Sequence, residues 1–388
     1  MSHILIVVQR YGDEVVGGSE GHARVVASRL ALSHRVEIAT TTAADYWTWA
    51  PYYKAGTSEL DGLRVHRFPA EGRDPEFKAF ESKVLSGEHA LADEEEWLRR
   101  QGPHCPGLLE FLKDDGARYD AILFYTYIYE PTARGVPIVP ERAALISTAH
   151  DEGPLRLAPY RALFHLPRAF GFLTPEERDL VHRTFRNEHI PHQTLGLGLD
   201  APGAYDVDGF RSTYKLDGPL VLYLGQVNEG KGCDELLAAW AAYRSRPSAR
   251  PATLVLAGTV RMELPDRGDV VALGRIPAAE KYAALAAADA LVLPSRFESL
   301  GIVLLEAWQV GTPALVRADN PVTAGQVARS GGGVTYRDGD GDGFGDALER
   351  ATAARARLGA AGRAWVERES SWDAFDARLA QLVALTAP

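Results

Sequence analysis

Unbroken apolar runs, each followed by a loop and a helical pattern, recur through the second half of this chain. The first is PLVLYLGQ at residues 219–226, and ATLVLAG, DVVALG, ADALVLP, TPALVRA and GGGVTY follow it. Strands of a parallel sheet have such runs because helices cover both faces of the sheet. The alternation of these runs with helical patterns predicts a doubly wound α/β unit.

A similar series opens the chain. HILIVVQ is followed by a glycine-rich turn (YGDEVVGGSEGH), a helical pattern and a second apolar run, RVEIATT. The series resumes at DAILFYTYIY, AALISTAH and RAFGFLTPEERDLVHRTF. A chain of 388 residues is too long for one core, so we predict two α/β units. A stretch with glycine and proline at residues 191–203 divides them, which gives an N-terminal unit over 1–195, a second unit over 196–370 and a last helix over 371–388.

Composition and charge exclude several classes of protein. The net charge of -10, without a long basic run, makes nucleic acid an unexpected partner. The two cysteines, Cys105 and Cys233, lack metal-ligand spacing and are expected to be free thiols. We find no signal peptide and no run of ~18 apolar residues, so we expect a cytoplasmic protein without a transmembrane segment. The acidic, helical segment at 70–115 is open to three interpretations: an insertion, a lid or a solvated helical face.

The stretch RFESLGIVLLEAW, residues 296–308, carries the most specific chemistry. It follows the strand ADALVLP, so Glu298 lies in a loop and Glu306 within the helix that comes next. The amides of Ser299, Leu300, Gly301 and Ile302 begin this helix and are suited to a phosphate. A carboxylate accepts two hydroxyl hydrogen bonds, which fits the diols of a sugar or ribose. Alternatively, Glu298 caps the helix and Glu306 pairs with an arginine.

Three other loops follow predicted strands. Lys231 lies in GQVNEGKG and is suited to neutralise a phosphate, although isolated surface lysines are common. Gly17 and Gly18 offer a close approach to the backbone before the first helix. His150 and Asp151 follow AALISTAH, where a polar strand end is the alternative explanation. Ligands of parallel α/β sheets bind outside the carboxyl ends of the strands, so we expect a site between the two units.

Together these motifs resemble the family-4 retaining, nucleotide-sugar-dependent glycosyltransferases. The resemblance rests on the GG-S-E loop, the strand-end His150, the G-x5-K-G loop, the segment LGRIPAAEKYAALAAADALVLPS, and PSRFESLGIVLLEAW with its E-x7-E spacing. It covers nearly the whole chain. It implies the GT-B architecture, an α/β fold of two Rossmann-like doubly wound domains that face each other across a cleft. The N-terminal domain would bind the acceptor, the C-terminal domain the donor, and the last helix would cross back to the N-terminal domain.

The resemblance also implies a role for each motif. Glu298 would contact hydroxyls of the donor sugar, Glu306 the ribose, and His150 the transferred sugar. The amides of residues 300–302 would hold the sugar and diphosphate, with Lys231 neutralising the diphosphate. The backbone near Ile276 would read the base, with Lys281 near it. The implied catalytic residues are therefore Glu298, His150 and Lys231, and the donor-binding residues are Gly17, Gly18, Gln226, Lys231, Ile276, Arg296, Glu298, Ser299, Leu300, Gly301, Ile302 and Glu306.

One position departs from the family pattern. Gln226 stands where the family commonly has arginine, and glutamine supplies no charge to the leaving group. The expected reaction is a same-face substitution in which the leaving diphosphate oxygen takes the acceptor proton. Weaker stabilisation of the diphosphate is therefore expected unless Arg296 or Arg261 compensates. The resemblance implies no cofactor and no divalent metal.

Two segments have less specific chemistry. DYWTWAPYY, residues 45–53, is rich in aromatic rings that stack on sugars or pack in a core, so Trp47, Trp49 and Tyr52 are candidate acceptor residues, with Asp151. DGDGDGFGDALE, residues 338–349, has the spacing of a calcium-binding EF-hand loop. A strand-like run precedes it where a helix belongs, which favours a solvated loop.

We therefore expect a metal-independent, retaining transferase that moves a hexose-type sugar from a nucleoside diphosphate to a hydroxyl of a glycan, glycolipid precursor or small metabolite. The alternatives are a nucleotide-sugar epimerase and a non-catalytic nucleotide-sugar binding protein. A phosphorylase would need a lysine for pyridoxal phosphate, which no segment suggests. Base, sugar, acceptor, linkage and oligomeric state are left open, as is peripheral contact with a membrane.

Overall fold

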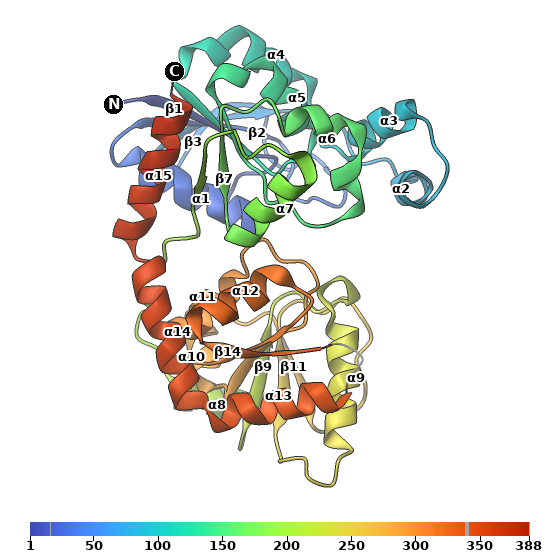
Figure 1. Cartoon of the computed structure of the whole chain (residues 1–388), viewed down its shortest axis with the longest axis vertical. Helices are drawn as coiled ribbons and strands as arrows, with labels where there is room; N and C mark the ends of the chain where they lie inside the picture. Colours follow the sequence, from blue (N-terminus) through green and yellow to red (C-terminus); the bar gives the residue numbers. More distant parts are fainter. Residues whose placement is uncertain (16, 338–340, 388) are drawn as a thin grey trace. The chain divides into compact units, whose positions relative to one another are not determined.

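The computed structural model describes residues 1–15, 17–337 and 341–387 (Figure 1). These residues form two compact units. Unit 1 comprises Met1–Leu197 together with Phe375–Pro388, and unit 2 comprises Gly198–Ala374. Each unit has its own sheet and its own buried core, and the chain passes between them twice.

The sheet of unit 1 has the strand order β3-β4-β2-β1-β5-β6-β7-β8. All neighbouring strands pair in parallel except β3 and β4, which form an antiparallel hairpin at the edge. The strands are β1 (His3–Val7), β2 (Arg35–Thr41), β3 (Gly56–Leu60), β4 (Leu63–Phe68), β5 (Ala121–Tyr125), β6 (Ala143–Ile146), β7 (Ala169–Phe172) and β8 (His192–Thr194). Strands β2, β3 and β4 lie on one side of β1 in the sheet, and β5 to β8 lie on the other side. The strand order thus reverses between β1 and β5, where ligands of such sheets bind at the carboxyl ends.

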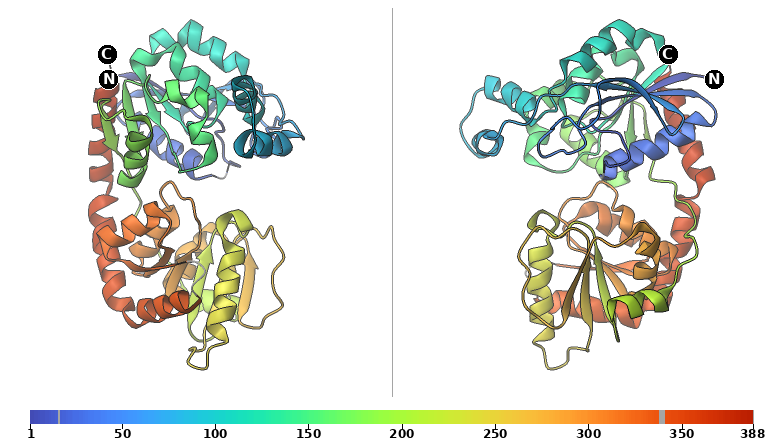
Figure 2. Two further views of the ribbon diagram at one scale, coloured as in Figure 1. Left: turned by 45° about the vertical axis from the view of Figure 1, so that its right-hand side comes forward. Right: turned by 180° about the vertical axis from the view of Figure 1, so that it is seen from behind.

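Helices cover both faces of this sheet, as the unbroken apolar runs predict. They are α1 (Gly18–Ala31), α2 (Phe77–Ser86), α3 (Leu91–Gln101), α4 (Pro106–Asp115), α5 (Glu130–Gly135), α6 (Ala158–Leu163), α7 (Pro175–Phe185) and α15 (Trp372–Thr386). Helices α2 and α3 project from the side of unit 1 (Figures 1 and 2). Trp97 of α3 is nevertheless fully buried in the core, so the segment 70–115 is anchored to the unit and is not only a solvated helical face.

The last helix, α15, packs against α1 in unit 1. Its side chains Phe375, Leu379 and Leu382 are buried. The Phe375 ring meets the His22 ring edge-on, with 6.0 Å between the centroids, and Asp376 forms an ion pair with Arg29. Residues from the end of the chain therefore complete the core of its first unit.

The sheet of unit 2 has the strand order β11-β10-β9-β12-β13-β14, and all pairs are parallel. Its strands are β9 (Leu220–Leu224), β10 (Thr253–Ala257), β11 (Val270–Gly274), β12 (Ala290–Leu293), β13 (Ala314–Arg317) and β14 (Gly333–Tyr336). Its helices are α8 (Val207–Tyr214), α9 (Cys233–Arg244), α10 (Lys281–Ala287), α11 (Ile302–Gln309), α12 (Pro321–Ser330), α13 (Gly341–Ala353) and α14 (Arg355–Glu369). Here the strand order reverses between β9 and β12.

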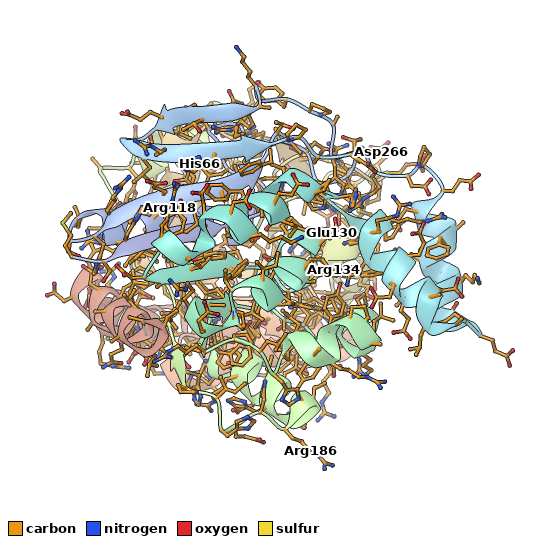
Figure 3. The ribbon with its side chains drawn as sticks, turned by 90° about the horizontal axis from the view of Figure 1, so that it is seen from above. His66, Arg118, Glu130, Arg134, Arg186 and Asp266 are labelled. Carbon is orange, nitrogen blue, oxygen red and sulfur yellow. The ribbon has the colours of Figure 1, made fainter. Side chains whose placement is uncertain are left out.

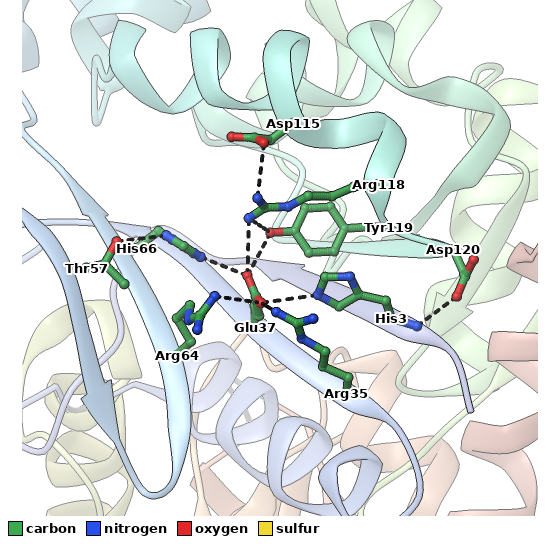
Figure 4. A network of polar contacts seen from close by, with 10 residues as sticks. All are labelled: His3, Arg35, Glu37, Thr57, Arg64, His66, Asp115, Arg118, Tyr119 and Asp120. Atoms are coloured by element: carbon green, nitrogen blue, oxygen red, sulfur yellow. Dashed lines mark hydrogen bonds and ion pairs between the residues drawn. The ribbon is translucent and has the colours of Figure 1, made fainter.

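A buried carboxylate in β2 organises the amino-terminal part of the unit 1 sheet. The Glu37 side chain is 2% exposed and accepts hydrogen bonds from His66 Nε2 at 2.9 Å and Tyr119 Oη at 2.9 Å (Figure 4). Arg118 also reaches this carboxylate, and Figure 3 shows His66 and Arg118 close together. Burial alone would raise the pKa of Glu37, but these hydrogen bonds, with those from Arg35 and His3, lower it to about 2. Glu37 is therefore an ionised structural hub.

Candidate active site

The reversal point of the unit 2 sheet holds an ion pair between two predicted site residues. Lys231 ends a short 3-10 helix (Glu229–Lys231) in the loop after β9, and Glu298 lies in the loop after the neighbouring strand β12. Lys231 Nζ lies 2.8 Å from Glu298 Oε1, and the side chains are 41% and 18% exposed. A cation and a hydrogen-bond acceptor thus stand together at the sheet edge where ligands bind.

Helix α11 begins beside this pair. Its N-cap, Gly301, has φ 66° and ψ 57°, a left-handed conformation that favours glycine. The Cβ of any other residue would also come within 3.3 Å of Thr323 Cγ2. Leu300 is buried, and its carbonyl accepts a hydrogen bond from Gln326 Nε2, whereas Ser299 and Ile302 are half-buried. The first N–H groups of α11 have no carbonyl one turn earlier in the helix and are suited to bind an anion.

The second glutamate of the E-x7-E motif also pairs with a lysine. Glu306 lies in α11 with its side chain 12% exposed, and its Oε1 lies 2.5 Å from Nζ of Lys281 at the start of α10. Glu306 therefore pairs with a basic side chain, as the alternative explanation expects, but this side chain is a lysine and not an arginine. Each acid of the motif is held by a lysine from a different loop or helix of unit 2.

Gln226 occupies the loop between β9 and Lys231. Its Oε1 accepts a hydrogen bond from Asn228 Nδ2 at 2.8 Å, and Asn228 Oδ1 accepts one from the backbone N–H of Lys231 at 2.9 Å. Gln226 therefore helps to fix the loop that carries the lysine. Arg261 is exposed, and its N–H donates to the Val227 carbonyl at 2.8 Å, which places it beside this loop.

Two other predicted donor residues lie farther along the sequence of unit 2. Arg296 is half exposed and pairs with Glu235 at 2.5 Å. Ile276 is half-buried after β11. Arg296 is therefore already engaged by a carboxylate, whereas Arg261 forms no ion pair within the described residues.

In unit 1 the two glycines of the first loop have different surroundings. Gly17 is the N-cap of α1, and a Cβ there would lie 2.1 Å from Glu20 Oε2. The Glu20 carboxylate is buried and accepts hydrogen bonds from Gln9 and Arg10, which follow β1. A Cβ at Gly18 would meet nothing within 4 Å among the described residues, so protein packing does not require glycine there.

The segment after β6 carries His150 and Asp151. His150 is half-buried. Asp151 is 55% exposed and lies 2.5 Å from Arg156. Thr148, two residues before His150, has φ 49°, a strained conformation for a β-branched residue. The turn that leads to His150 is thus conformationally unusual.

The three aromatic candidates for acceptor binding differ in exposure. Trp47 and Tyr52 are 53% and 61% exposed. Trp49 is fully buried, and its Nε1 donates a hydrogen bond to the Gln101 carbonyl at 2.8 Å. The Trp49 ring therefore packs inside unit 1, whereas Trp47 and Tyr52 present their rings to solvent.

Comparison with known proteins finds a family model for part of the chain and a relative over nearly all of it. The family model for glycosyl transferases group 1 matches residues 218–353, the part that holds both lysine–glutamate pairs. A GDP-mannose-dependent α-(1-6)-phosphatidylinositol monomannoside mannosyltransferase of Mycolicibacterium smegmatis is 29% identical over 95% of this chain and 94% of its own length. This chain is a glycosyltransferase, and its residues 218–353 match group 1.

Solved structures give the fold of this glycosyltransferase. Sucrose-phosphate synthase from Thermosynechococcus elongatus has a TM-score of 0.71 and 20% identity, over 99% of this chain and 98% of that one. The catalytic domain of starch synthase IV from Arabidopsis thaliana, bound to ADP and acarbose, has a TM-score of 0.64 and 16% identity, over 99% of both chains. The GT-B fold expected from the sequence motifs is therefore confirmed.

Several residues that hold the candidate site residues or their neighbours in place have no role assigned from the sequence. Asn228 and Glu20 position Lys231 and Arg10, respectively, and Glu177 of α7 binds the backbone that leads to His150. Glu177 has a detectable signal, because T-P-E-E has the spacing of a capping box. Thr174 Oγ1 indeed accepts a hydrogen bond from the Glu177 N–H.

Part of the EF-hand-like stretch of the glycosyltransferase lies outside the described residues. These are Asp338, Gly339 and Asp340, so the structure does not test calcium binding there. Within the described residues no cluster of three or more His, Cys, Asp or Glu side chains is arranged for a metal. The helices described here also include none with the length and apolar character needed to cross a membrane.

Proposed function

We propose that this glycosyltransferase transfers a hexose from a nucleoside diphosphate to an acceptor hydroxyl with retention of configuration and without a divalent metal. The observation that carries the proposal is the Lys231–Glu298 pair at the β9/β12 reversal point. Lys231 and the first amides of α11 supply positive charge for a diphosphate. Glu298 would accept hydrogen bonds from the sugar, and Glu306, held by Lys281, from the ribose.

The reaction then needs positioning and electrostatic stabilisation. The bond between the anomeric carbon and the diphosphate oxygen breaks as Lys231 and the helix amides stabilise the leaving charge. The leaving oxygen accepts the proton of the acceptor hydroxyl, and the acceptor oxygen bonds to the same face of the sugar. His150 would contact the transferred sugar. Lys231 takes the electrostatic role that a metal ion has in other transferases.

The relative from Mycolicibacterium smegmatis suggests specific substrates, because its similarity extends over nearly the whole chain. We propose GDP-mannose as donor and a mannosylated glycolipid as acceptor. The exposed rings of Trp47 and Tyr52 offer surfaces for stacking on a sugar face or an acyl chain. The proposal includes a cytoplasmic location, where cell fractionation would find the protein.

A panel of nucleotide sugars tests the donor. GDP-mannose should raise the melting temperature more than UDP-glucose, ADP-glucose or dTDP-glucose, because a ligand stabilises the folded state that binds it. If none of the four shifts the melting curve, the proposal fails. Product formation with GDP-mannose and octyl α-D-mannoside, followed by NMR, should give an α linkage at a rate that EDTA leaves unchanged.

The same assay separates the alternatives. An epimerase would convert the donor without an acceptor, and a binding protein would show a thermal shift without turnover. Glu298→Ala should abolish product formation while the chain keeps its melting temperature within a few degrees.

A further inference from the structure

Glu177 is a buried carboxylate beneath the turn that carries His150. It lies in the first turn of α7 and is 1% exposed. Its Oε1 accepts hydrogen bonds from Ser147 Oγ at 2.6 Å and from the Ala149 N–H at 2.9 Å. Its Oε2 accepts one from the Leu173 N–H at 2.7 Å. One side chain therefore joins the segments that follow β6 and β7.

The two residues that Glu177 holds after β6 flank the strained Thr148. Thr148 is 6% exposed, and its φ of 49° is unfavourable for a β-branched side chain. Such a conformation persists only where the surroundings hold it, and it is common at functional sites. The segment after β5 also contacts this turn, because the Tyr127 N–H donates a hydrogen bond to the Ser147 carbonyl at 3.0 Å. The turn is thus fixed from α7 and from the segment after β5, and His150 is the next residue after Ala149.

The chemistry of Glu177 fits this positioning. Burial raises the pKa of its carboxyl to about 7, although its hydrogen bonds favour the ionised form. Burying a carboxylate is costly, but an apolar side chain here would leave the Ser147 hydroxyl and the Ala149 and Leu173 N–H groups without an acceptor. The three groups that bond to Glu177 are all donors, so the side chain at this position must accept hydrogen bonds. Glutamine would present an amide N–H₂ group to one of the donors.

We propose that Glu177 is a positioning residue for glycosyl transfer: it holds the Thr148 turn so that His150 meets the transferred sugar. The inference rests on the role proposed above for His150. Glu177 is 1% exposed, so its effect on turnover passes through His150. Removing it should change the chemical step while donor binding in unit 2 is kept.

A double-mutant cycle on the full chain tests this coupling. With GDP-mannose and octyl α-D-mannoside, His150→Ala should lower kcat about 100-fold and Glu177→Gln about 10-fold, with the donor KM within twofold. The double variant should be no slower than His150→Ala. A double variant slowed about 1,000-fold would overturn the proposal, as would a Glu177→Gln variant with full kcat.

The control is Glu37→Gln. Glu37 is equally buried in the same unit but belongs to the network at the amino-terminal part of the sheet. This variant should have a lower melting temperature than wild type and a kcat within twofold of the wild-type value. Should Glu177→Gln fail to fold, Ser147→Ala removes only one of the three hydrogen bonds and should lower kcat about threefold. If Ser147→Ala also kept full kcat, the proposal would fail.

A second measurement does not depend on turnover. The rate at which diethyl pyrocarbonate modifies His150, located by mass spectrometry, should change at least threefold in Glu177→Gln and stay constant in Glu37→Gln. An unchanged rate in Glu177→Gln contradicts the positioning role. If His150→Ala keeps full activity, the role proposed for His150 fails, and the proposal for Glu177 with it. If only the coupling is absent, the proposed function stands and the inference alone is wrong.

Discussion

Two lysines of unit 2 hold the two acids of one motif, yet they should have different kinetic effects. In the proposed function Lys231 stabilises charge on the leaving diphosphate, so Lys231→Ala should lower kcat/KM about 100- to 1,000-fold. Lys281 acts on Glu306, which is assigned to the ribose, so Lys281→Ala should raise the donor KM about 10-fold and leave kcat unchanged. Steady-state kinetics with GDP-mannose separates the two. Equal effects on kcat would contradict the assignment.

At residue scale, candidate site residues can be recognised from the sequence more readily than the side chains that pair with them. The E-x7-E spacing and its helix start are local features, so Glu298 and Gly301 can be recognised from a short segment. The lysines that pair with Glu298 and Glu306 lie 67 and 25 residues away, and folding brings them there. Trp49 and Trp47 look alike in the sequence, but only packing reveals that one is buried.

Glu177 should give unit 1 a pH-dependent stability. The folded state raises its pKa from 4.5 to about 7, so the folded state binds a proton that the unfolded state releases in this window. Its contribution is therefore fully present below pH 4.5 and falls by roughly 3 kcal/mol as the pH rises through 7. Chemical unfolding of wild type and Glu177→Gln at a series of pH values should show this fall in the difference between their free energies of unfolding. A difference that is constant from pH 5 to 8 would refute it.

At the scale of single elements, two glycines at the starts of helices should respond differently to alanine. Gly301 has a left-handed backbone before α11, so Gly301→Ala should cost about 1–2 kcal/mol of stability and weaken donor binding. Gly18 has no such constraint, and a Cβ there meets no described residue within 4 Å. Gly18→Ala should therefore keep the melting temperature and reduce turnover, as calorimetry and kinetics would check. A loss of stability in Gly18→Ala would contradict this.

Strands buried on both faces are predicted well from sequence, whereas a mostly exposed strand is not. RVEIATT coincides with β2, and all of its residues except Arg35 are buried. The β3–β4 hairpin was missed, since β3 is mostly exposed and has no apolar run. Its signal is the Asp61-Gly62 turn, in which both residues have positive φ, a dipeptide that favours a two-residue hairpin.

At the scale of the whole molecule, the stability of unit 1 should depend on the end of the chain. Phe375 is fully buried against unit 1, so Phe375→Ala should lower its free energy of unfolding by about 3–5 kcal/mol. Gln381, exposed on the same helix, is the control, and Gln381→Ala should change stability by less than about 0.5 kcal/mol. Calorimetry of the two variants checks this. Equal melting temperatures would show that α15 is dispensable.

The return of α15 to unit 1 has a consequence for how the protein is made. The ribosome releases Met1–Leu197 first, then the whole of unit 2, and only then the residues from Phe375 that complete unit 1. At usual rates of synthesis, roughly 10–35 s pass between the release of Leu197 and the release of Phe375. During that time the unit synthesised first exposes the apolar surface that α15 will cover. The nascent chain should therefore bind chaperones through unit 1 while unit 2 is already folding.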